Sequence, residues 1–397
     1  MQRMMFRHNR IVPRVACYAA AVVLTGASVV SCSSGGDEAA GSAPSAALSS
    51  DVSPEIAAAA AHAEELGLKF AVSHDEIVER AREEGAVVVQ TSAPEFGPFE
   101  EGFETSFPFI DLKSVQLSGA TTERFLLEAE TPAPPRYDVA YLAPEAYDQI
   151  AGMTDWDIYG MAEAGILDIP LGMIDPERRT VVSPGNTGVA LAYNRTLVSQ
   201  DELPTSWDDL ADPKWGRDQL GMAMDVDMNN IAVLAAADGW DVDRVVALSK
   251  KMAKNNPIWT DGHTAADLLV QSGEVAISPF VNLHNTVRII DKAPDGPLQL
   301  AFIEPVPVRL SESMAVFNDD FAQAPYSALL FLEWHANDVA QSLLDADPVQ
   351  ASLYWEGSRM GEMIEGLDQG VTTHAQMEEL PSWVTKVQEA FGFPSMS

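Results

Sequence analysis

Short apolar runs alternate with amphipathic segments along most of the chain. Residues 73–76 (SHDE) match a capping box, in which the serine hydroxyl accepts from the glutamate amide and the glutamate reaches back. The box predicts a helix to Glu84 that ends at Gly85. Residues 86–90 (AVVVQ) form a nearly continuous apolar run, which is typical of a strand buried on both faces.

The same alternation repeats to the end of the chain. It predicts strands over 114–117, 138–142, 188–194, 275–277, 298–303 and 314–317. It predicts helices over 55–66, 121–130, 144–150, 241–253, 264–271, 327–335, 338–345 and 373–391. Strands that alternate with helices indicate an α/β fold with a largely parallel sheet.

The first 31 residues have a different character. Four arginines precede an apolar stretch over 15–30, which is long enough for a signal segment and too short for a comfortable membrane span. Val29-Val30-Ser31-Cys32 resembles a bacterial lipobox, which implies that Cys32 is acylated and becomes the first mature residue. An uncleaved anchor and a plain secretory signal are the alternatives. Residues 32–54, rich in Ser, Gly and Ala, are expected to form a flexible tether.

Composition and charge narrow the functional classes. Cys17 lies in the apolar stretch and Cys32 is the expected lipid site, so the body of the protein has no cysteine for a disulfide, a thiolate metal site or a thiol nucleophile. The chain has 59 acidic and 24 basic side chains, a net charge of −35. This charge repels nucleic acid and anionic headgroups, so we expect neither as a partner. The acidic side chains either form a solvated surface without a role in binding or attract cationic ligands.

Motifs of several enzyme classes are absent. The sequence contains no G-x-S-x-G, H-E-x-x-H, C-x-x-C, G-x-G-x-x-G or phosphate-loop pattern, and its seven histidines are scattered. No carboxylate pair stands out among so many acids. We therefore expect no catalytic residues, no cofactor and no metal.

Several short motifs from Glu84 to about Leu344 occur in the order of one family. They are EGAVVVQTS at 84–92, LSGA at 117–120, YDVA at 137–140, LAYN at 191–194, LPTSWDDL at 203–210, DPKW at 212–215, GHT at 262–264, GEVAI at 273–277 and EPVPV at 304–308. Each is weak alone. Together they resemble the extracellular solute-binding proteins of bacterial ABC importers, in particular the binders of ferric iron, thiamine, phosphonate and polyamines.

This resemblance implies a two-lobed α/β fold of the periplasmic-binding-protein type II class. Two crossover strands, expected near 181–194 and 301–314, would join the lobes, and a solute would bind in the cleft as the hinge closes. The expected division is a signal peptide at 1–31, a tether at 32–54, lobe one at 55–187, lobe two at 188–305, and the second part of lobe one with the C-terminal helices at 306–397.

The resemblance does not extend to an iron site. Iron-binding members carry two adjacent tyrosines after the strand that matches 275–277, an acid after the third strand and often a histidine after the first. Here the tyrosine positions hold Val281 and Asn282, within a residue, and the acid position falls near Ala143. Ferric iron needs a hard phenolate donor, so this loss argues against direct ligation. A metal chelate or an organic ligand remains open.

Candidate ligand contacts in lobe one lie at strand ends and at the first crossover. The loop before the helix at 121–130 can present backbone amides to a carboxylate or phosphate, although an ordinary helix cap has the same sequence. Open α/β sheets place ligands beyond the carboxyl ends of their strands. These candidates are Thr91, Ser92, Ser118, Gly119, Ala120, Tyr141, Asn186 and Thr187.

Lobe two supplies a second group of candidates: Asp225, Phe280, Asn282, His284 and, at the second crossover, Glu304. Asp225 could meet a cationic group, but its surroundings lack the Gly and Glu of an EF-hand loop, so calcium is rejected. Arg288 and Arg309 are conspicuous in so acidic a chain. Either could clamp an anion bidentately or form a salt bridge.

We interpret the chain as a lipid-anchored, extracytoplasmic and monomeric binding protein that captures a small polar solute. The sequence favours an organic anion or a zwitterion as this solute. It would deliver this solute to the permease subunits of an importer. A sensor lipoprotein that presents a ligand to a receptor is the alternative, and an extracellular hydrolase that uses cleft acids is a weaker one.

Overall fold

The structure is a computed structural model. It describes residues 52–91, 96–116, 120–129, 131, 136–224, 226–346 and 349–394, except for the side chains of residues 120–124. Cys32, Ser92, Ser118, Gly119 and Asp225 lie outside the described residues. Within the described part, no helix is both long and apolar enough to cross a membrane.

The first lobe is built on a four-stranded sheet with the order β10-β3-β1-β2. Its strands are β1 (Ala86–Thr91), β2 (Asp111–Gln116), β3 (Val139–Leu142) and β10 (Ser313–Val316). Strand β1 runs parallel to β2 and β3, whereas β10 returns from later in the chain and pairs antiparallel to β3. The carboxyl ends of the three parallel strands therefore share one edge of this sheet.

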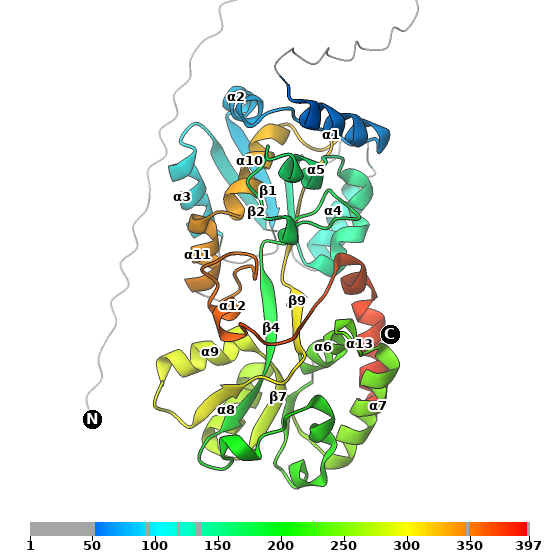
Figure 1. The fold of residues 1–397 in the computed structure, drawn as a ribbon, viewed down its shortest axis with the longest axis vertical. Coiled ribbons are helices and arrows are strands. Elements are labelled where there is room, and N and C mark those ends of the chain that lie inside the picture. Colours follow the sequence, from blue (N-terminus) through cyan, green and yellow to red (C-terminus); the bar gives the residue numbers. More distant parts are fainter. Residues whose placement is uncertain are drawn as a thin grey trace, which may run out of the picture. The chain divides into compact units, whose positions relative to one another are not determined.

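Helices pack around this sheet (Figure 1). They are α1 (Pro54–Glu65), α2 (His74–Glu84), α3 (Gly97–Ser106), α4 (Ala120–Ala129), α5 (Ile158–Glu163), α10 (Pro325–His335) and α11 (Asp338–Ala346), whereas α12 (Arg359–Met363) buries Met360 in another cluster, with Ala190 and Leu283. The capping box predicts α2 correctly: the Ser73 hydroxyl accepts from the Glu76 amide at 3.1 Å, and Gly85 ends the helix with a φ of 67°. Helix α2 then leads directly into β1.

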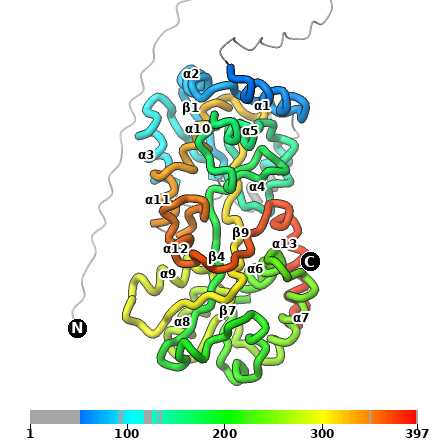
Figure 2. The backbone as a smooth tube through the Cα atoms, in the orientation of Figure 1, coloured from blue at the N-terminus to red at the C-terminus, as the bar shows by residue number. Residues whose placement is uncertain are grey.

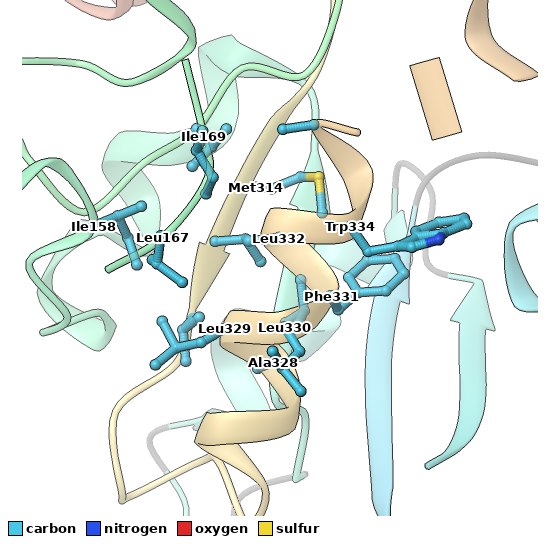
Figure 3. Close-up of a cluster of buried hydrophobic side chains, with 14 of the residues drawn as sticks. Ile158, Leu167, Ile169, Met314, Ala328, Leu329, Leu330, Phe331, Leu332 and Trp334 are labelled. Atoms are coloured by element: carbon cyan, nitrogen blue, oxygen red, sulfur yellow. The ribbon is translucent and has the colours of Figure 1, made fainter. Parts of the chain in front are cut away.

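Helix α10 lies at the centre of the first-lobe core (Figure 3). It is apolar on nearly all sides, which is typical of a helix surrounded by protein. Phe331 and Trp334 belong to the same buried cluster as Met314 of β10 and Ile158 of α5. This packing brings segments from both ends of the chain into one lobe.

The second lobe is built around a long strand, β4 (Asn186–Asn194), in a sheet with the order β11-β9-β4-β7, with β8 also paired to β4. The other strands are β7 (Ile277–Asn282), β8 (Leu298–Ala301), β9 (Val306–Leu310) and β11 (Gln369–Val371). All three partners of β4 are antiparallel to it. The expectation of a largely parallel fold thus holds for β1, β2 and β3 but is wrong here.

The remaining elements complete the second lobe. They are β5 (Gly221–Ala223), β6 (Ile258–Thr260), α6 (Val226–Val233), α7 (Val242–Met252), α8 (His263–Ser272) and α9 (Leu283–Lys292). Strand β7 begins at Ile277, the last residue of the strand predicted over 275–277, and runs on through Pro279. Proline has no amide to donate to a sheet, which is why the sequence pattern stopped too early.

Strands β4 and β9 run side by side between the lobes (Figures 1 and 2). Both lie within the ranges expected for the crossovers. The C-terminal helix α13 (His374–Phe391), expected with lobe one, contacts both lobes: His374 lies against Ser313 and Asp175, and Met377, Leu380 and Trp383 are buried in the second-lobe cluster. Its amphipathic face gave no information about which lobe it would cover. The other expected lobe boundaries remain predictions.

Candidate functional site

The crossover strands bring charged and polar residues from distant parts of the chain together. In the β4–β9 ladder, Thr187 is paired with Arg309, so their side chains lie on the same face of the ribbon. Ser313 is paired with Leu142 at the carboxyl end of β3. Glu312 therefore lies next to the 3-10 helix η1 (Pro144–Gln149), which carries Glu145.

Arg309, Glu145 and Glu312 form a charge cluster whose members are not ion-paired. Within the described residues, no carboxylate oxygen lies within 4.0 Å of the Arg309 guanidinium, and its buried Nε has no hydrogen-bond partner. One carboxylate oxygen of Glu145 and one of Glu312 are also buried without a partner. By contrast, Arg179 forms two hydrogen bonds of 2.9 Å with the carboxylate of Asp157.

Burial explains the electrostatics of the charge cluster. It lowers the pKa of Arg309, although the charges of Glu145 and Glu312 oppose this change. Burial and the neighbouring Glu145 raise the pKa of Glu312 to about 7, and Arg309 opposes this shift. A charge taken out of water is costly unless it is paired, so the buried atoms of the cluster carry a desolvation cost.

The second lobe contributes an amide at the end of β7. Asn230 on α6 donates to the Phe280 carbonyl at 2.7 Å and to Asn282 Oδ1 at 2.8 Å. Asn282 is paired with Val189 of β4 and immediately precedes α9. Asn230 Oδ1 is buried and has no partner. Asn282 is therefore fixed in position, while an acceptor beside it remains unsatisfied.

His284 lies in the first turn of α9 and is almost fully buried. The Asn285 amide nitrogen is 3.0 Å from His284 Nε2 and 2.6 Å from His263 Nε2. Since this nitrogen can only donate, both Nε2 atoms accept, and the proton of neutral His284 lies on Nδ1. That Nδ1 has no partner. Burial, followed by the charge of Arg309, lowers the pKa of His284 to about 3, so the ring is a neutral donor.

The crossover itself adds another unsatisfied donor. Asn186 is 1% exposed, and its Oδ1 accepts from the Leu353 amide at 3.0 Å, while its Nδ2 has no partner. The Thr187 hydroxyl accepts from Gln350 Nε2 at 2.9 Å. The structure therefore places Thr187 and Asn282 of the predicted residues on one face of β4 and His284 near Arg309, whereas Asn186 lies on the opposite face of the strand.

Comparison with known proteins agrees with this architecture. The model of the family described as bacterial extracellular solute-binding protein matches residues 103–347. The chain belongs to this family. Comparison with curated proteins gives no match.

Solved structures of the same fold bind or transport solutes. A Bordetella ferric binding protein is 14% identical, with a TM-score of 0.62, covering 77% of this chain and 98% of that one. The Trichodesmium protein IdiA (FutA), in complex with iron and citrate, is 17% identical, with a TM-score of 0.60, covering 78% and 100%. The substrate-binding protein of an ABC transporter from Agrobacterium tumefaciens is 14% identical, with a TM-score of 0.54, covering 78% and 96%. These likenesses establish the two-lobed type II fold.

Other predicted residues take structural positions in this solute-binding protein. Phe280 has no exposed surface, and its ring stacks on Trp207 with centroids 4.4 Å apart. Glu304 is exposed and accepts from the Asp368 amide at 2.8 Å, which fixes the start of β11. Both side chains have structural contacts, and their role as ligand contacts stays a prediction. Ala120 begins α4.

Two first-lobe candidates lie near the carboxyl ends of β1 and β3. Thr91 and Tyr141 are paired in the β1–β3 ladder, and both are buried. The Tyr141 ring packs edge-on against His335, with centroids 5.4 Å apart. Burial raises the pKa of Tyr141 well above 10, and the charge of Glu312 adds to this effect. Tyr141 is therefore a neutral core residue that borders the cluster.

Glu145 and Glu312 are not predicted from the sequence, and Arg309 is predicted only as either an anion clamp or a salt-bridge partner. The two glutamates could not be distinguished in a chain with 59 acidic residues. Arg309 carried the only usable signal, as a basic residue beside an expected crossover. The decisive information is the lack of an ion pair, which depends on the strand register.

A serine, a histidine and an aspartate also line up near the crossover. Ser313 Oγ is 2.9 Å from His374 Nε2, and His374 Nδ1 is 3.3 Å from Asp175 Oδ2. This is the order of a hydrolase triad. Ser313 has no exposed surface, however, so a substrate carbonyl cannot reach its hydroxyl. The contacts instead join the start of α13 to β10.

A metal site is not evident in the described part of the chain. There, no group of three or more His, Cys, Asp or Glu side chains is arranged to hold an ion. The two positions that matched the tyrosines of iron binders, Val281 and Asn282, lie at the end of β7. The donors of the site are amides, an imidazole, two carboxyl groups and a guanidinium, which suit an organic solute better than a bare ferric ion.

Proposed function

We propose that this chain is the lipid-anchored substrate-binding protein of an ABC importer. It captures a small polar solute between the lobes without covalent chemistry and delivers it to the permease subunits. The observation that carries the proposal is the charge cluster at the crossover strands of a solute-binding fold. The motifs around Cys32 support anchoring to the outer face of a bacterial membrane by lipid, with the body of the protein acting as a monomer.

Capture follows from the cost of the unsatisfied groups. A solute that pairs with Arg309 and accepts from His284 offsets the desolvation cost of these groups. Because these groups come from the crossover strands and the second lobe, a solute that contacts them together with Glu145 or Glu312 favours a closed arrangement. Binding is therefore coupled to hinge closure by differential contacts in the two states.

Several solved structures of this fold are described with iron, whereas we expect a different ligand for this chain. The absence of adjacent tyrosines at Val281 and Asn282 favours a metal-free solute or a carboxylate chelate over bare ferric ion. Ferric citrate and free citrate are therefore informative probes to compare. Equal binding of both would indicate that the carboxylates, and not the metal, are recognised.

A thermal-shift screen tests capture. The probes are ferric citrate, citrate, phosphate, a phosphonate, thiamine, spermidine, succinate and a pool of amino acids. A solute at one hundred times its dissociation constant stabilises the folded protein by about 2.7 kcal/mol, which gives a clear shift. Small-angle scattering then measures closure. Turnover of a probe, or binding without any closure, would contradict the proposal.

Anchoring is tested separately. The Cys32→Ala variant, expressed in a bacterial host, should move from the membrane fraction to the soluble fraction, while Cys17→Ala serves as the matched control. Metabolic labelling with a palmitate analogue should mark the unmodified protein and the control but not Cys32→Ala. Label retained by Cys32→Ala would refute the lipid anchor without affecting solute capture.

A further inference from the structure

The Arg309 guanidinium has no carboxylate oxygen within 4.0 Å among the described residues. Its side chain lies on the crossover strand β9, next to Thr187 of β4, and its buried Nε has no acceptor. Several described arginines are ion-paired, for example Arg359, which lies 3.1 Å from an Asp291 oxygen. A guanidinium matches a planar carboxylate by two parallel hydrogen bonds. One end of the solute is therefore anionic.

Glu145 and Glu312 create the opposite requirement on the first-lobe side. Each has a buried carboxylate oxygen with no donor, and no cation of the described residues lies within 4.0 Å of either. Two nearby carboxyl groups in a partly buried position are stabilised by a donor that carries positive charge. An ammonium group supplies three N–H donors and one positive charge. The other end of the solute is therefore cationic.

Solutes of a single charge type satisfy only half of this arrangement. A dicarboxylate would compensate Arg309 but would bring a second negative charge towards the two glutamates. A diamine would satisfy the glutamates but would leave Arg309 unpaired beside a like charge. We propose that the charge cluster recognises an amphoteric solute of the amino-acid class, with its carboxylate at Arg309 and its ammonium at Glu145 and Glu312.

An independent donor lies near the expected carboxylate position. His284 Nδ1 is unpartnered, and this residue is at least nine-tenths buried. His284 follows Asn282, which is paired with Val189 of β4, and the charge of Arg309 contributes to the low pKa of His284. A carboxylate has about four acceptor positions, so it can use this donor in addition to Arg309.

This inference rests on the proposed function, and a matched set of four-carbon probes tests it. Succinate has two carboxylates, γ-aminobutyrate has one carboxylate and one ammonium, and putrescine has two ammonium groups. Isothermal titration calorimetry on the whole protein compares these three and the twenty common amino acids. We expect at least one amphoteric compound to bind and neither succinate nor putrescine to bind at tenfold higher concentration.

The outcomes separate the two proposals. Tighter binding of succinate or putrescine than of any amphoteric probe would overturn the amphoteric solute but leave solute capture intact. Binding of thiamine, a phosphonate or ferric citrate alone would do the same. If no compound of the wider screen binds, both proposals fail.

Variants identify the two ends of the solute. Arg309→Gln and Glu312→Gln should each weaken binding of the amphoteric probe by about 10- to 100-fold, because each loses a charge-assisted hydrogen bond. Arg244→Gln and Glu389→Gln, which alter exposed residues away from the cluster, should bind normally. Arg309→Lys keeps the charge but not the planar fork, and it should retain part of the affinity if the Gln variant does not fold.

Proton linkage gives a readout that a merely structural role would not change. An ammonium beside Glu312 favours its ionised form, so binding near neutral pH should release protons, whereas a dicarboxylate would promote proton uptake. Calorimetry in phosphate and in Tris buffer reports the sign of this exchange. Proton uptake with the amphoteric probe, or release that persists in Glu312→Gln, would overturn the assignment of the cationic end.

Discussion

His335 offers a test of how burial controls the acid stability of the first lobe. The ring has no exposed surface, and neither of its nitrogens has a hydrogen-bond partner. It stacks on Phe99 with centroids 4.9 Å apart and packs against Phe331 at 5.4 Å. Burial lowers the pKa of His335 from 6.5 to about 3. The folded protein therefore keeps a neutral imidazole at pH values where the unfolded chain binds a proton.

The size of the effect follows from this difference. Because the folded pKa is lower than the unfolded one, the contribution of His335 to stability is complete above about pH 6.5 and declines as the pH falls towards 3. At pH 5, about 1.5 pH units below the unfolded pKa, the loss is about 2 kcal/mol. Phenylalanine retains the ring contacts and cannot be protonated, so His335→Phe should escape this loss.

Urea denaturation of His335→Phe and the unmodified protein at pH 7.5 and pH 5.0 measures this difference. The free energy of unfolding of the variant should gain about 2 kcal/mol relative to the unmodified protein between the two pH values. Overpacking by the larger ring changes both values equally and cancels. His335→Leu provides a smaller replacement, and exposed His62→Gln provides the control. A constant difference at both pH values would refute the reasoning.

Three further substitutions have defined expectations. Phe280→Ala should lower the free energy of unfolding by about 3–5 kcal/mol, because the ring is buried against Trp207, and a loss below 1 kcal/mol would contradict that burial. Gly185→Ala should lower the free energy of unfolding, measured by urea denaturation, by about 1–3 kcal/mol, because a Cβ at this position collides with backbone atoms. Gly152→Ala is the control, since a Cβ there meets nothing within 4 Å and should not disturb packing. Burial raises the pKa of Asp175, but contacts led by the His374 hydrogen bond outweigh it and lower the pKa from 3.8 to about 2. The free energy of unfolding of Asp175→Asn should therefore be about 2 kcal/mol lower than that of the unmodified protein at pH 7. That deficit should shrink only below about pH 4, as the unmodified protein loses the same contribution, and a deficit that shrinks above pH 5 would contradict the assignment.

Local sequence signals predicted the elements whose determinants are local. The capping serine, the glycine with positive φ and the apolar run after it lie within about twenty residues, and α2 and β1 begin and end within a residue of the prediction. The helix predicted over 241–253 is observed as α7, Val242–Met252. In each case the residues that determine the boundary are neighbours in the sequence.

Long-range pairing decided the features that the sequence did not reveal. Nothing in the sequence of β4 states that its three partners are antiparallel, because strand direction depends on connections of up to about a hundred residues. The family resemblance predicted Phe280 to lie in a ligand-binding loop, whereas in the structure its ring stacks on Trp207. The placement of α13 depends likewise on second-lobe residues that its apolar face must match in shape.

The solute site depends on charges that are local in space but distant in the sequence. The net charge of −35 predicts a cationic ligand, whereas Arg309 predicts an anionic ligand. Charges on the surface act through water and are screened over about 8 Å at physiological salt, whereas partly buried charges are screened much less. The acidic coat therefore cannot compensate Arg309, and the few buried groups beside the crossover outweigh it. Because two of those groups are acidic and one is basic, and none is ion-paired within the described protein, the solute itself must bring both signs of charge.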